Sequence, residues 1–130
     1  MHFTPLPIDG LFRIEPARHG DERGWFSETF RDDAFRANAA DVAFVQENRS
    51  FSQKSGTLRG LHFQTPPRAQ GKLVSCIAGA LWDVAVDIRH GSPTYGQWHG
   101  MELTPENGVQ FWIPAGFAHG FCTLVDNTVI

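Results

Sequence analysis

Three basic side chains in the segment GTLRGLHFQTPPRAQGK, residues 56–72, are the groups of this sequence best suited to chemistry. His62 can accept a proton near neutral pH, and Lys72 carries a positive charge that could stabilise a developing oxyanion. A base and a cation of this kind are what the removal of a proton from a carbon next to a ketone requires, because that step creates an enolate. Arg59 adds a planar guanidinium that suits phosphate oxygens.

The spacing of Arg59 and His62 leaves open whether they share a pocket. The two residues are three positions apart, so on a regular strand their side chains would point to opposite faces. They would point the same way only if a bulge or twist at Gly60 redirected one of them.

A second motif, IPAGFAHGF at residues 113–121, contains a P-x-G-x-x-H pattern that resembles the second motif of the cupin superfamily. Metal-binding cupins combine this histidine with two histidines and an acid near the first motif. Here the first motif reads His62-Phe63-Gln64, and the basic Lys72 stands where an acid would be sought. His62 and His119 beside an ammonium group make a poor site for a divalent cation. A metal-dependent cupin enzyme is therefore the less favoured alternative.

Length and charge set the broad class. The chain has 130 residues and a net charge of -3, which predicts one domain with no basic surface for nucleic acid or an anionic membrane. Any anionic ligand must be held by a few local arginines and lysines. No segment approaches the roughly 20 apolar residues that cross a bilayer, and the start of the chain does not resemble a signal peptide. We expect a soluble, cytoplasmic protein.

Hydrophobic periodicity predicts an all-β fold. In Leu81 to Arg89 the apolar side chains, Trp82 among them, alternate with Asp83, Ala85 and Asp87, which predicts a half-buried strand. We expect Trp82 and Trp112 to lie in the core. Other strand-like runs are residues 24–30, 44–48, 57–64, 72–77, 96–103, 110–113 and 120–124. Only Asp32 to Ala40 is helix-like, with Asp32 as its cap. Short strands between turn signals predict an antiparallel sandwich or barrel.

Six motifs together resemble the dTDP-4-dehydrorhamnose 3,5-epimerase family of metal-free, cupin-like jelly rolls. They occur in the family's order, at residues 21–30 (DERGWFSETF), 45–50 (VQENRS), 58–64 (LRGLHFQ), 69–74 (AQGKLV), 83–98 and 112–121 (WIPAGFAHGF). The resemblance implies an all-β, cupin-like antiparallel jelly-roll barrel, with one short helix near residues 32–40 and a single domain over residues 1–130.

The resemblance also implies an activity, the inversion of C3 and C5 of dTDP-4-dehydro-6-deoxy-D-glucose to give dTDP-4-dehydro-L-rhamnose in dTDP-L-rhamnose biosynthesis. By this resemblance His62 removes the protons and Lys72 stabilises the enolate, without a metal or other cofactor. Arg23 and Arg59 would hold the diphosphate. Further substrate contacts implied in the same way are Phe26, Glu28, Gln46, Asn48 and His119. Since Glu28 alternates with Phe26 and Phe30, the three are expected to share one environment.

The resemblance further implies a homodimer with exchanged N-terminal strands. It places a proton-donating tyrosine, and an aspartate that pairs with the base histidine, beyond Ile130. We therefore expect a family member shortened at its C-terminus. A module that binds a sugar nucleotide without turnover remains an alternative to the epimerase.

Overall fold

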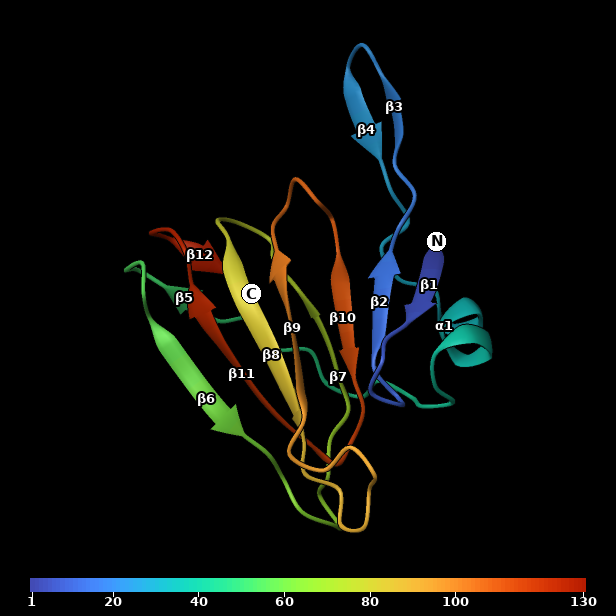
Figure 1. The fold of residues 1–130 in the computed structure, drawn as a ribbon. Helices are drawn as coiled ribbons and strands as arrows, with labels where there is room; N and C mark the ends of the chain where they lie inside the picture. Colours follow the sequence, from blue (N-terminus) through green and yellow to red (C-terminus); the bar gives the residue numbers. More distant parts are fainter.

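A computed structural model of the chain, which describes residues 1–130, consists mainly of two four-stranded antiparallel sheets (Figure 1). The first sheet has the order β1 (His2–Pro5), β2 (Phe12–Glu15), β10 (Gln110–Ile113) and β7 (Lys72–Ser75). The second has the order β6 (Leu58–His62), β11 (Phe117–Thr123), β8 (Leu81–Asp87) and β9 (Trp98–Leu103). The chain passes repeatedly from one sheet to the other, and the predicted all-β class is confirmed.

Apolar side chains between the sheets form the main core. Leu11, Leu81, Leu103 and Phe111 are fully buried there, and each such side chain contributes roughly 1.5 to 3 kcal/mol by leaving water. Strands β6 and β7 are the edge strands of their sheets. The side of the sandwich that they border holds the cavity described below.

The one helix, α1 (Asp32–Asn38), packs outside the first sheet. Phe35 lies edge-on to Trp112, with ring centroids 5.0 Å apart, and both rings are buried. The predicted burial of Trp112 is thus confirmed. The predicted cap is wrong, because Arg31 is the N-cap and makes no side-chain capping bond. Asp32 is instead the first helical residue and pairs with Arg36 at 2.9 Å.

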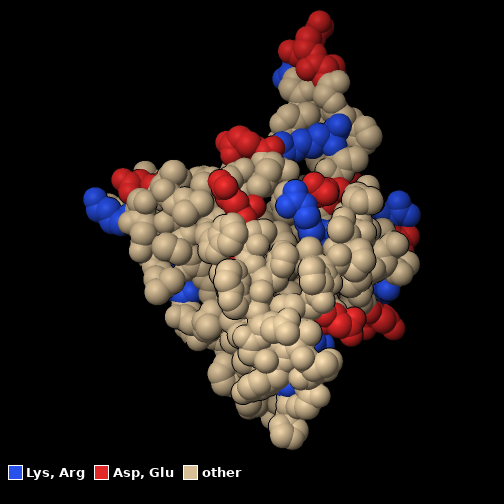
Figure 2. Space-filling model, in the orientation of Figure 1, with Lys and Arg blue, Asp and Glu red and all other residues tan.

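Strand β8 buries the opposite face from the one that we expected to be buried. Asp83 and Asp87 are fully buried between the sheets, whereas Trp82 is 40% exposed, so the prediction of a core position for Trp82 is wrong. The Trp82 ring lies across Gly100 of β9, where a Cβ atom would come within 2.6 Å of it. The outer face of the second sheet is therefore apolar, and Figure 2 shows few charged side chains over β6, β11 and β8.

A two-stranded hairpin projects from the sandwich (Figure 1). It consists of β3 (His19–Asp21) and β4 (Gly24–Phe26). At its base Arg18 donates hydrogen bonds to the carbonyls of Pro105 and Glu106, and its guanidinium lies 4.1 Å from the centroid of the Trp25 ring. These contacts tie the hairpin to the turn between β9 and β10.

Several predicted strands are shorter than expected or differ in position. The predicted strand at 24–30 ends at Phe26, and residues 44–48 form no strand. Phe44 instead packs against Phe30, Phe35 and Trp112 over the first sheet. The remaining strands are β5 (Phe51–Ser52) and β12 (Thr128–Val129), which pair with each other. No helix of the structure is long and apolar enough to span a membrane.

Candidate active site

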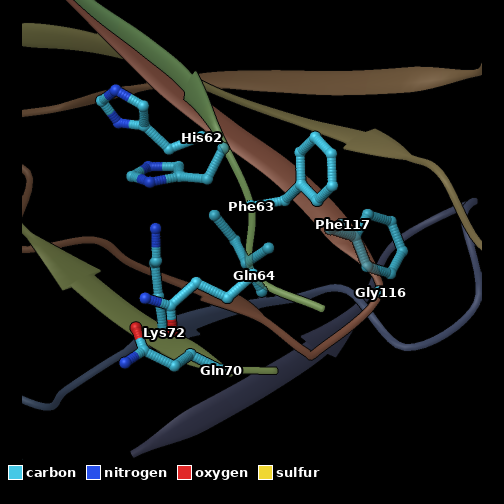
Figure 3. Close-up of a pocket in the computed structure, with 9 residues that line it drawn as sticks. His62, Phe63, Gln64, Gln70, Lys72, Gly116 and Phe117 are labelled. Carbon is cyan, nitrogen blue, oxygen red and sulfur yellow. The ribbon is translucent and has the colours of Figure 1, made fainter. Parts of the chain in front are cut away.

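His62, Lys72 and His119 line one cavity of about 330 Å³, although they come from three strands in two sheets. His62 lies on β6, His119 on β11 and Lys72 on the facing edge strand β7. Figure 3 shows the Lys72 and His62 side chains extending toward the same space. His62 is exposed to this space and is not packed in the core. A proton acceptor and a fixed positive charge therefore border a single cavity.

A second, larger cavity of about 1450 Å³ adjoins the first and shares His62, Lys72 and His119 with it. Its lining also includes Arg59, Gln46 and Asn48. Gln46 donates to the Asn48 side-chain oxygen at 3.0 Å, so these two amides form a polar pair on the cavity wall. Six of the residues proposed from the sequence are thus brought together by the fold.

A bulge between β6 and β11 places Arg59 and His62 on the same side. His62 is opposite His119 and Arg59 is opposite Phe121, so two residues of β6 face the single residue Gly120 of β11. Gly60, at φ +107°, adopts the backbone conformation that this shift requires. The irregularity at Gly60 that the sequence left open is therefore present in the structure.

Replacing Gly60 with alanine is expected to destabilise the fold by about 2 kcal/mol or more, because the site cannot accept a Cβ atom. That atom would lie 2.7 Å from both the Gly120 Cα and the His119 carbonyl oxygen. Urea unfolding measures the change. Gly56→Ala is the matched control, since Gly56 also has positive φ but no neighbour within 4 Å, and a loss of about 1 kcal/mol is expected there. Equal losses in both variants would contradict a steric role for Gly60.

Lys72 reaches the cavity because successive side chains of β7 point alternately to the two faces of the sheet. It is paired with Ile113, and Val74 two residues later is buried in the main core, whereas Leu73 packs with Trp112 outside the sheet. Gly71 leaves room for that indole, since a Cβ atom there would lie 2.3 Å from it. The strand therefore directs the ammonium group inward.

Arg59 is held by two hydrogen bonds at the wall of the larger cavity. Its Nε donates to the Ser52 hydroxyl at 3.2 Å, and one Nη donates to the Phe51 carbonyl at 3.0 Å. The guanidinium has five N–H donors, so further donors remain for an anion. The arrangement suits an oxyanion of a phosphate group.

The sequence reasoning missed one residue next to the site, the buried Asp83. Its Oδ1 lies 2.7 Å from His119 Nε2, and its Oδ2 has no hydrogen-bond partner. The strand alternation of β8 did reveal that Asp83, Ala85 and Asp87 share a face. It did not reveal that this face points inward.

Three predicted contacts, Arg23, Phe26 and Glu28, do not join this cavity within one chain. Arg23 lies at the hairpin tip, with 86% of its side chain exposed, and pairs with Asp21 at 2.6 Å. Phe26 is 73% exposed. The shared environment expected for Phe26, Glu28 and Phe30 is wrong, because Phe30 packs against Phe35 and Phe44.

The side chains are also not grouped as a metal site. No set of three or more His, Cys, Asp or Glu residues has a geometry that could hold a metal ion. The Asp83 carboxylate contacts Nε2 of His119.

Comparison with known proteins places the chain in a family. Residues 5–130 match the family model of dTDP-4-dehydrorhamnose 3,5-epimerase. The chain belongs to this family. The dTDP-4-dehydrorhamnose 3,5-epimerase of Sinorhizobium fredii is 60% identical over 130 residues, which are 100% of this chain and 67% of that protein. The Shigella flexneri enzyme of the same name is 53% identical, over 97% of this chain and 70% of its own length.

Solved structures of epimerases have the same fold. The Elizabethkingia anophelis dTDP-4-dehydrorhamnose 3,5-epimerase superposes with a TM-score of 0.93 at 46% identity, over 99% of this chain and 70% of that one. A Legionella pneumophila dTDP-6-deoxy-D-glucose-3,5-epimerase in complex with dTDP-4-keto-L-rhamnose gives 0.91 at 50% identity, over 98% and 68% of the two chains. The family and the cupin-like jelly roll that the sequence predicted are confirmed.

Proposed function

We propose that this chain is an isomerase that inverts C3 and C5 of dTDP-4-dehydro-6-deoxy-D-glucose, giving dTDP-4-dehydro-L-rhamnose for dTDP-L-rhamnose biosynthesis. The observation that carries the proposal is the meeting of His62 and Lys72 at one cavity from facing sheets. The substrate is identified from the activity for which the family is named. We also propose that the protein acts in the cytoplasm.

The proposed mechanism uses a single base for both carbons. C3 and C5 both adjoin the C4 ketone, so removal of either proton leaves an enolate with its charge on the same oxygen. His62 accepts the proton, and the Lys72 ammonium stabilises that oxygen. Addition of a proton to the opposite face, from solvent or from the tyrosine that the family resemblance implies beyond Ile130, then inverts the carbon, and His62 returns its proton to solvent. Each step exchanges one proton and leaves no net change in oxidation state.

The larger cavity suits the nucleotide part of the substrate. Arg59 would bind the diphosphate, with Gln46 and Asn48 as polar contacts along the wall. His119 would contact the sugar beside His62, since the two histidines are directly opposite each other on β6 and β11. We also propose that residues 1–130 act as a single jelly-roll domain.

In a homodimer, the projecting hairpin would contribute residues to the site of the partner subunit. Trp25, Ser27 and Thr29 face the cavity of their own chain, whereas the intervening Phe26 and Glu28 do not line it. We propose that Arg23, Phe26 and Glu28 complete the site of the partner subunit, as exchanged N-terminal strands would allow. The apolar outer face of the second sheet, with Trp82 and Trp98 at 40% and 61% exposure, is suited to contact with a second copy.

Mixing two inactive variants tests this exchange. Arg23→Ala and His62→Asn chains, unfolded together in equal amounts and refolded, are expected to recover about one quarter of the wild-type rate, because half of the dimers are mixed and each mixed dimer contains one intact site out of two. A hairpin that served its own chain would give no recovery. Light scattering of the mixture confirms that dimers are present.

The product tests the function itself. Proton NMR of the reaction is expected to show the L-rhamno configuration, with both C3 and C5 inverted. Inversion at C3 alone would contradict the proposed double epimerisation, and binding of dTDP without any turnover would favour a sugar-nucleotide-binding module.

A further inference from the structure

Strand β8 buries two aspartates on one face, and only one of them has hydrogen-bond partners for both of its carboxylate oxygens. Asp87 accepts two hydrogen bonds from the Arg89 side chain, each 3.0 Å, and others from Ser92 and Thr94. Asp83, four residues earlier, has the single contact to His119 Nε2. Both side chains are fully buried. The fold therefore explains Asp87 but leaves one Asp83 oxygen without a partner.

A buried carboxylate with an unpaired oxygen destabilises the folded state, so stability does not explain its presence. Burial raises the pKa of Asp83, while the hydrogen bond from His119 and the charges of His119 and Lys72 lower it. The groups around it are His119 on β11 and Lys72 on the facing β7, and beyond β11 lie Arg59 and His62 on β6. All four of these basic residues belong to the proposed site.

We infer that Asp83 is a positioning residue for epimerisation, which fixes the ring of His119 through Nε2 so that Nδ1 is available to the substrate. Nε2 is the ring nitrogen that hydrogen-bonds to the protein, and His119 lines both cavities. An ionised Asp83 accepts a hydrogen bond from Nε2 and so favours the tautomer with its proton there. His119 then presents Nδ1 beside His62 and Lys72 as an acceptor when neutral and as a donor when charged. This inference rests on the proposed function.

Asp83→Asn removes the charge and keeps the size, and Asp87→Asn is its matched control on the same face of the same strand. The two variants should differ in stability at pH 7. The pKa of Asp83 is raised on folding, so stability is lost as the pH rises from the unfolded pKa through the folded pKa, and Asp83→Asn should melt at the same or a higher temperature. The pKa of Asp87 is held low, chiefly by its hydrogen bond from Arg89. Its stabilisation is present above the unfolded pKa, and Asp87→Asn should melt lower.

Activity should rank the two variants the other way: Asp83→Asn should lose activity, whereas Asp87→Asn should not. Asp83→Asn is expected to slow deuterium exchange at C3 and C5 by about 10- to 100-fold in kcat with little change in KM, and to alter the pH profile. Asp87→Asn should keep the wild-type rate per folded molecule. Equal rates in the two variants, or losses that follow only the folded fraction, would overturn the inference.

Nitrogen NMR of histidine-labelled chain provides a readout that does not need turnover. In the wild type, His119 is expected to carry its proton on Nε2. In Asp83→Asn, the amide can also donate, so a mixture with the Nδ1–H form is expected, whereas Asp87→Asn should leave the His119 signals unchanged. An unchanged tautomer in Asp83→Asn would refute the role of Asp83 even if the proposed function held. A shifted tautomer in a chain without turnover would support the positioning role and count against the proposed function alone.

Discussion

Replacing His62 with asparagine is expected to slow proton exchange at both C3 and C5 by about 10³-fold or more, while dTDP still binds. Asparagine is similar in size but cannot accept the proton. Binding should persist because Arg59, Gln46 and Asn48, which also line the larger cavity, are unchanged in this variant. The rates come from the loss of the C3 and C5 proton signals in deuterated water, and the affinity from calorimetric titration with dTDP.

His99→Asn is the matched control for this prediction. His99 packs against Phe111, with ring centroids 6.2 Å apart, and lines neither cavity. We expect its exchange rates to equal those of the wild type. An unchanged rate in His62→Asn, or a fall in dTDP affinity as large as the fall in rate, would show that His62 is not the base.

Replacing Lys72 with methionine is expected to slow exchange at both carbons by about 10²- to 10³-fold, because the enolate oxygen loses its positive partner. Methionine keeps the length of the side chain, so the packing beside Ile113 and Val74 should survive. Both carbons should be affected equally, since both deprotonations place negative charge on the C4 oxygen.

The affinity for dTDP separates this role from phosphate binding. Lys72→Met should bind dTDP as the wild type does, because dTDP lacks the ketone that Lys72 stabilises. The other lysine of the chain, Lys54, is exposed and lies outside both cavities, so Lys54→Met is the control. If dTDP affinity fell in Lys72→Met as far as the rate, Lys72 would be a phosphate contact instead.

The sequence predicted the chemistry of the site better than its geometry. His62, Lys72 and His119 were identified because their types and motifs suit enolate chemistry, and the fold brings them to one cavity. The spacing of Arg59 and His62 could not decide whether they share a face, because a bulge depends on the partner strand as well. Gly60 signalled that possibility, and the close approach of Gly120 makes it a defined bulge.

The orientation of β8 could not be predicted, because alternation separates two faces without saying which is buried. The apolar face carrying Trp82 is the outer one, and the aspartates point inward. Their burial is possible because each aspartate has a basic partner: Arg89, two residues after Asp87, and His119 of β11, which contacts Asp83. Similarly, the aromatic pattern of residues 24–30 gave no sign that the strand ends at Phe26 and that Phe30 turns toward α1.

The most direct test of the central claim is proton NMR of dTDP-4-dehydro-6-deoxy-D-glucose with the wild-type 130-residue chain in deuterated water, after removal of metals with EDTA. We predict loss of the C3 and C5 signals at a rate that EDTA does not change and that His62→Asn abolishes. No exchange in a folded chain that binds dTDP, or exchange that requires an added divalent metal, would contradict proton abstraction by His62 with Lys72.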